Sequence, residues 1–202
     1  MKTSLDRLLD GYHRFRRKYA QGDESIMHHL SESGQNPDSM VVACSDSRVD
    51  PALILQCQPG DLFVIRNVAN IIPPFVKDNS HHGTSAALEY GICFLKVKHL
   101  IILGHSQCGG IQALLHHDDV KRNDFIKNWV SIMKKDNFCP ETPDEYAKFV
   151  IQQSYKNCMT FPWIKKRVDG GNLLIHLWFF DIKSGEIFVY SEENDDYIPL
   201  LS

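Results

Sequence analysis

The sequence predicts an α/β fold, a single domain with a central mostly parallel β-sheet flanked by helices, plus an N-terminal helical extension. Three observations favour it. Short apolar runs of strand length alternate with helical segments, as in sheets whose strands are joined by crossover helices. The run "VKHLIILGH", residues 97–105, is apolar nearly throughout, which is typical of a strand buried on both faces. The chain has 202 residues, 43% of them hydrophobic, enough for one core. We therefore expect one domain over 1–202, with 1–30 as a helical arm.

Each element of this fold has a local signal. Strands are expected where apolar and β-branched residues cluster between turn signals, at 40–43, 62–67, 97–105, 172–181 and 185–190. Helices are expected where apolar side chains recur at helical spacing, at 4–20, 51–57, 81–96, 109–117 and, with a break at 138–144, over 121–168. Pro51 suits the first turn of its helix, and Thr84 or Ser85 can cap the helix that begins near 81. The acidic tail at 191–197 should be solvated.

Composition excludes several classes of function. The net charge is -3, so no basic surface indicates nucleic-acid binding. The longest apolar runs are too short to span a bilayer, and the N-terminus has no apolar signal segment, so we expect a cytoplasmic protein without membrane contact. The chain has 6 cysteines. Without a secretory signal, metal ligands or free thiols are the better interpretation of them than disulfides.

Two motifs end neighbouring strands of the predicted sheet. Cys44, Asp46 and Arg48 follow the strand at 40–43, and His105 and Cys108 close the strand at 97–105. If the two strands are parallel neighbours, these groups meet at the edge where ligand sites gather. Two thiolates and one imidazole are the ligands of a Cys2His zinc site, a count that leaves a fourth position open. The alternative, a Cys44 nucleophile with His105 as its base, leaves Cys108 without a role.

Residues from about 35 to 115 resemble the β-class carbonic anhydrases closely, a combined motif signal that is specific. The segments "ACSDSRV", "QPGDLFVIRNVAN", "GTSAALEY" and "GHSQCGG" all stand in the family order. The resemblance implies one Zn²⁺ per subunit, held by Cys44, His105 and Cys108. It implies reversible hydration of CO2 to bicarbonate and a proton through zinc-bound hydroxide. It also implies a homodimer or homotetramer in which the N-terminal helix reaches over a partner.

The resemblance also assigns roles to further positions. Asp46 is expected to accept a hydrogen bond from the zinc-bound hydroxide and to aim it at CO2, or to bind zinc itself in a closed state. Arg48 is expected to hold the Asp46 carboxylate bidentately, which a lysine cannot do. The substrate-pocket positions that carry over from the family are Gln35, Gly109, Phe63, Val68 and Tyr90.

Two alternatives remain open, and one family feature is not expected. Hydrolysis of CS2 or COS would use the same fold and ligands. A non-catalytic zinc- or bicarbonate-binding module would have its fourth position closed, which the intact Asp46–Arg48 pair argues against.

Some bacterial members of the family carry a regulatory bicarbonate site built from a tryptophan, an arginine and a tyrosine. Of these three, only the arginine is present here, as Arg66, because Val41 and Phe180 occupy the other two positions. The remaining cysteines are expected to be free thiols and the paired histidines to be solvated: Cys57, Cys93, Cys139, Cys158, His28–His29, His81–His82 and His116–His117.

Overall fold

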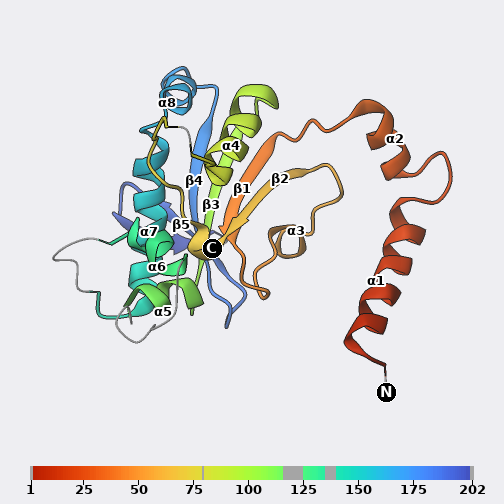
Figure 1. Cartoon of the computed structure of the whole chain (residues 1–202), viewed down its shortest axis with the longest axis horizontal. Coiled ribbons are helices and arrows are strands. Elements are labelled where there is room, and N and C mark those ends of the chain that lie inside the picture. Colours follow the sequence, from red (N-terminus) through yellow and green to blue (C-terminus); the bar gives the residue numbers. More distant parts are fainter. Residues whose placement is uncertain (1, 79, 116–124, 135–139, 201–202) are drawn as a thin grey trace.

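The protein has a central six-stranded sheet. Its structure is a computed structural model that describes residues 2–78, 80–115, 125–134 and 140–200. The six strands have the order β2-β1-β3-β4-β5-β6. They are β1 (Ser39–Cys44), β2 (Leu62–Asn67), β3 (His99–His105), β4 (Leu174–Phe180), β5 (Ile187–Ser191) and β6 (Asp196–Pro199). The pairs among β1 to β4 are parallel, whereas β5 and β6 are antiparallel additions at one edge. The predicted α/β fold with a mostly parallel sheet is confirmed (Figure 1).

Helices connect and cover the strands. They are α1 (Ser4–Tyr19), α2 (Ile26–Ser33), α3 (Pro51–Ile54), α4 (Gly83–Glu89), α5 (Gly109–Leu115), α6 (Ile126–Ser131), α7 (Pro143–Cys158) and α8 (Pro162–Asp169), with a 3-10 turn η1 (Val68–Asn70) and a π-helical turn η2 (Tyr90–Phe94). α7 packs directly on β3, where a side chain at Gly104 would lie 2.6 Å from Ile151 Cδ1. Glycine at this position therefore lets helix and strand approach closely.

The first two helices stand apart from the sheet (Figure 1). Thr3 and Asp6 form a capping box that starts α1, each side chain accepting a hydrogen bond from the other's backbone N–H. No residue of α1 is buried. Its apolar stripe is exposed and consists of Leu5, Leu8, Leu9, Tyr12 and Phe15. In the part of the chain that is described, no helix is long and apolar enough to cross a membrane.

Two local expectations were wrong. His82 is the N-cap of α4 and no side chain caps that end, because the Thr84 hydroxyl instead accepts a hydrogen bond from Asn67 Nδ2 at 3.3 Å. The acidic tail is not wholly solvated, since β6 forms within it and Tyr197 is buried against Phe179. The expected break within the helical region over 121–168 is confirmed, since α6 ends at Ser131 and α7 begins at Pro143, and a further helix, α8, begins at Pro162. His116, His117 and Cys139 lie outside the described residues.

Candidate metal centre

Three ligand-type side chains meet at the carboxyl ends of β1 and β3. Cys44 ends β1, His105 ends β3, and Cys108 lies in the turn that leads into α5. Because β1 and β3 are parallel neighbours, their last residues lie side by side. The ligand atoms of the three residues lie within 4.8 Å of one another, with the two sulfurs 3.8 Å apart. Their exposed fractions are only 4%, 1% and 2%, so the group is buried.

The His105 ring is oriented for a metal. Its Nδ1 lies 2.8 Å from the Ser106 carbonyl oxygen, which makes Nδ1 the protonated nitrogen. Nε2 then carries the lone pair, and among the described residues it is buried without a hydrogen-bond partner. A buried ring nitrogen without a partner is costly in a native structure. A metal ion at Nε2 would remove that cost, and a carbonyl behind Nδ1 is the usual arrangement for a ligating histidine.

The two thiols lie in contact and affect each other's pKa. The hydrogen bond from Cys108 is the main cause that lowers the pKa of Cys44 to about 4, with smaller contributions from the backbone N–H groups of Asp46 and Ala69 and against the opposing effect of burial. The same contact, together with burial, raises the pKa of Cys108. A divalent cation would allow both sulfurs to be thiolates, because it cancels their repulsion. The donor set of two sulfurs and one imidazole nitrogen therefore fits zinc.

The backbone around the sulfurs adopts uncommon conformations. Ala69 and Gln107 have φ values of 62° and 55°, in the left-handed region that costs a residue with a Cβ about 1–3 kcal/mol. The left-handed Ala69 belongs to η1, which lies against the start of α5. A side chain at Gly110 would lie 2.7 Å from Val68 Cγ1, so glycine is needed where η1 covers the cysteines.

Asp46 and Arg48 form a two-point ion pair beside the cluster. Arg48 Nε donates to Asp46 Oδ1 at 3.0 Å, and Nη2 donates to Oδ2 at 2.7 Å. The backbone N–H of Arg48 also donates to Oδ1. This guanidinium holds the pKa of Asp46 well below its usual range, so the group is a carboxylate. In this structure Asp46 lies on Arg48 and is not a member of the cysteine–histidine cluster.

Several residues that support this pair were missed from the sequence. Arg48 Nη2 also donates to the Gln107 carbonyl at 3.1 Å, and the Gln107 N–H donates to Asp144 Oδ1 on α7 at 2.8 Å. Arg66, considered only as a remnant of a regulatory site, donates to the carbonyl oxygens of Cys44 and Asp46. The sequence carried no signal for Asp144, because it meets Gln107 only through the packing of α7.

The five expected substrate-pocket positions fall into two groups. Gly109 follows Cys108 at the start of α5, and Val68 lies in η1, so both border the cluster. Phe63 pairs with Met40 in the sheet, four residues before Cys44, which is about 13 Å along the strand. The Tyr90 ring lies 5.8 Å from that of Phe63, and Gln35 precedes β1. A single chain therefore does not bring these last three residues to the cluster.

Comparison with known proteins identifies the family. The family model described as carbonic anhydrase matches residues 39–187. The chain belongs to the β-class carbonic anhydrases. It is 34% identical to a carbonic anhydrase of Synechocystis, over 96% of this chain and 74% of that protein. It is 31% identical to beta carbonic anhydrase 3 of Arabidopsis thaliana, over 93% and 82%.

Solved β-carbonic anhydrases share the whole fold. The β-carbonic anhydrase CcaA superposes with a TM-score of 0.86 at 33% identity, covering 98% of this chain and 100% of that one. A tetrameric β-carbonic anhydrase of Sordaria macrospora gives a TM-score of 0.73 at 30% identity, covering 92% and 93%. The expected enzyme class and the Zn²⁺ cofactor are thereby confirmed, since this family uses zinc and Cys44, His105 and Cys108 are grouped to bind a metal ion.

Proposed function

We propose that this chain catalyses the reversible hydration of CO2 to bicarbonate and a proton, with Cys44, His105 and Cys108 holding one zinc ion per chain. The observation that carries the proposal is the Asp46–Arg48 pair, a carboxylate fixed in one orientation beside a buried metal-ligand cluster. A metal-binding module without activity has no use for such a carboxylate. Zinc, when bound, supplies a Lewis acid that activates water for attack on CO2.

The protein side chains orient the reactants. The Asp46 carboxylate accepts a hydrogen bond from the attacking water at one Oδ, and Arg48 keeps that oxygen from turning away. The Gln107 carbonyl fixes the guanidinium in turn. Val68 gives CO2 an apolar wall, and the Gly109 N–H donates to bicarbonate. One C–O bond forms and one O–H bond of water breaks, so each turnover yields one bicarbonate ion and one proton.

The site is completed by a second copy of the chain in this proposal. Gln35, Phe63 and Tyr90 lie too far along the strands to reach the cluster of their own chain, and Tyr90 is 44% exposed. The exposed apolar stripe of α1 also requires a cover. A similar β-carbonic anhydrase is tetrameric. We therefore propose a homodimer or homotetramer. Each chain forms one domain over 1–202, and its arm of residues 1–30 packs on a partner chain.

Stopped-flow measurement of CO2 hydration by the zinc-loaded protein tests the function. We expect activity that is lost with a zinc chelator and restored by Zn²⁺, together with about one zinc ion per chain by mass spectrometry of the metal. Parallel assays with COS and CS2 test the alternative substrates. A zinc-loaded protein that does not hydrate CO2 would refute the proposal. Cell fractionation tests the cytoplasmic location that we propose.

A further inference from the structure

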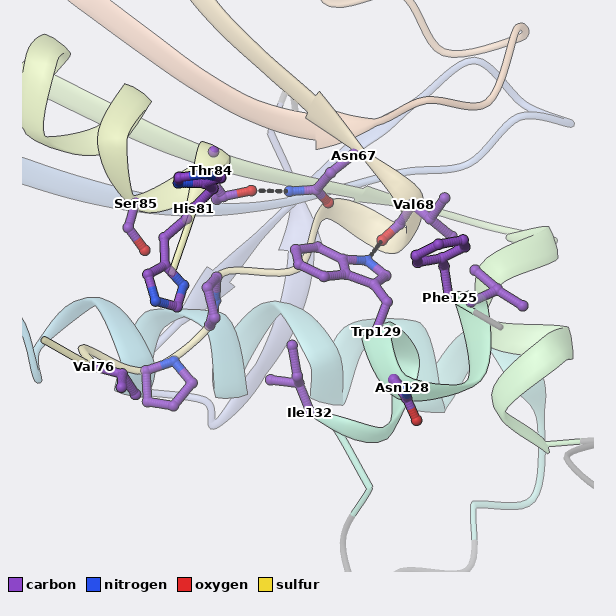
Figure 2. Close-up of a pocket in the computed structure, with 15 residues that line it drawn as sticks. Asn67, Val68, Val76, His81, Thr84, Ser85, Phe125, Asn128, Trp129 and Ile132 are labelled. Atoms are coloured by element: carbon purple, nitrogen blue, oxygen red, sulfur yellow. Dashed lines mark hydrogen bonds between the residues drawn. The ribbon is translucent and has the colours of Figure 1, made fainter. Parts of the chain in front are cut away.

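A large cavity lies near the metal centre. Its volume is about 950 Å³, and it lies between η1, the segment before α4, and α6 (Figure 2). Asn67 and Val68, at the end of β2 and in η1, are among the residues that line it. Asn67 pairs with Cys44 in the sheet, and its carbonyl oxygen accepts a hydrogen bond from the Ser45 N–H at 2.9 Å. One residue that lines the cavity, Asn67, is therefore the neighbour in the sheet of the metal ligand Cys44.

One wall of the cavity is polar. Asn67 Nδ2 donates to the Thr84 hydroxyl, while Asn67 itself is held by two hydrogen bonds to the backbone of Ile71. Ser85 and His81 also line the cavity, and Figure 2 shows both of them near Thr84. The opposite walls are mostly apolar, formed by Pro73, Pro74, Val76, Ile126, Trp129 and Ile132. The side chains of Asn67, Thr84 and His81 therefore offer water hydrogen-bond partners on this side of the cavity.

His81 and His82 are the only titratable side chains among the described residues that line the cavity. They differ in their surroundings. His82 Nε2 lies 2.7 Å from Asp78 Oδ1, and the Ser80 backbone N–H helps to keep the pKa of Asp78 below its ordinary value. This carboxylate holds His82 in place. His81 is exposed, and within the described residues its ring makes no hydrogen bond.

We propose that His81 carries the proton of each turnover from the metal centre to solvent, with water in the cavity as the link. The inference rests on the proposed hydration of CO2. The proton released when water and CO2 form bicarbonate passes along water to the His81 imidazole, which becomes an imidazolium ion and then yields the proton to a buffer base. Imidazole suits this role because it titrates near neutral pH. His82, tied to Asp78, is a positioning residue that fixes the segment.

The zinc-loaded variant His81→Ala tests this role. Proton transfer to solvent follows the formation of bicarbonate, so it affects kcat but not kcat/KM for CO2. We expect kcat at low buffer concentration to fall about tenfold or more, with kcat/KM and zinc content unchanged. Added imidazole should restore kcat, because a free base can take the place of the missing ring. The matched control is Asn128→Ala, which changes a side chain that lines the same cavity but cannot carry a proton, and it should leave both constants unchanged.

Three other results would contradict either the role of His81 or the proposed function. An unchanged kcat in His81→Ala, or an equal fall in kcat and kcat/KM that imidazole does not restore, would overturn the role of His81. His82→Ala should lower kcat less and respond less to imidazole, and the reverse order would assign the proton to His82 instead and overturn the proposal. A wild-type protein that binds zinc but shows no hydration would refute the proposed function itself, a result that is distinct from all of these.

Discussion

The two ends of the parallel strands differ in whether the side chains there are buried by their own chain. At the carboxyl ends of β1 and β3, the groups are polar, buried and bonded within one chain, and His105 Nε2 lacks only a metal ion. Near the amino end of β2, the Tyr90 ring stacks on Phe94 and makes a tilted contact with Phe63, yet Phe94 is 70% exposed. One end is completed by an ion and the other, in our proposal, by a second copy of the chain.

This difference separates two kinds of requirement. Metal binding needs three donors within a few ångströms, a precision that a single folded chain supplies from its own strands. Covering apolar surface needs area and little precision, so a partner can supply it. Substitutions at the carboxyl end should therefore abolish chemistry, whereas those at the arm should act through association.

The largest effect is expected for loss of a metal ligand. Cys108→Ala leaves Cys44 and His105, and two donors do not hold zinc tightly. Zinc content should fall from about one ion per chain to near zero, and CO2 hydration to the uncatalysed rate. Cys93→Ala is the matched control, because Cys93 is a free thiol outside the cluster. Retention of zinc by the Cys108 variant would contradict the ligand assignment.

Arg48 should matter for the reaction and not for the metal. Arg48→Ala releases the Asp46 carboxylate, and we expect kcat/KM to fall about 100-fold while zinc content stays near normal, since misplacement of a reacting group by an ångström has effects of this size. Arg48→Lys keeps the charge but loses the two-point contact, and should be nearly as impaired. Full activity of the lysine variant, or loss of zinc from either, would show that the role is misassigned.

The arm should control association. Leu8→Ala with Leu9→Ala removes two exposed apolar side chains of α1. Burial of one leucine contributes about 2 kcal/mol, so loss of both should raise the dissociation constant of the oligomer about 1000-fold or more. Analytical ultracentrifugation measures it, with Arg14→Ala on the same helix as control. Activity per chain should fall with dissociation, and an unchanged oligomer would refute the proposed contact.

Asp144 should have a smaller effect on catalysis. Its Oδ1 accepts the Gln107 N–H, and the Gln107 carbonyl accepts from Arg48. Asp144→Ala should lower kcat/KM about tenfold, the lower range for loss of such supporting bonds. Glu145→Ala, in the same first turn of α7, controls for the charge near the helix start. Equal losses in both variants would mean that helix stability, and not Gln107, is responsible.

The smallest effect concerns acid stability at Asp181. Hydrogen bonds from the Lys183 backbone N–H and the Ser106 hydroxyl hold the pKa of Asp181 below its ordinary value. A depressed pKa contributes stability above the unfolded value of about 3.9, and this contribution is lost as pH falls through the folded value. Asp181→Asn should therefore lower the Tm by about 2 °C at neutral pH, with a gap that closes on acidification. A gap that widens would contradict this.

Local patterns were sufficient for much of the fold. The apolar run at 97–105 predicted β3, and helical spacing predicted α1, because both signals arise from residues a few positions apart. The motifs at Cys44 and His105 needed one further assumption, that their strands are parallel neighbours, and the sheet order satisfies it. Where the outcome depended on a distant residue, prediction failed. The Thr84 hydroxyl turned to Asn67 rather than to the helix end, and Tyr197 packed against Phe179.

By itself, the order of residues determined which side chains can bind zinc, which arginine lies beside which carboxylate, and how the strands follow one another. These features follow from short motifs, in which the residues concerned are two or three positions apart. Only the tertiary structure decided that Asp144 supports Gln107 across 37 positions, that Val68 lines a cavity, and that Phe63 and Tyr90 lie away from the metal ligands. Such relations depend on how helices and strands pack, and packing is set by the shape and burial of the whole core, which no short segment specifies.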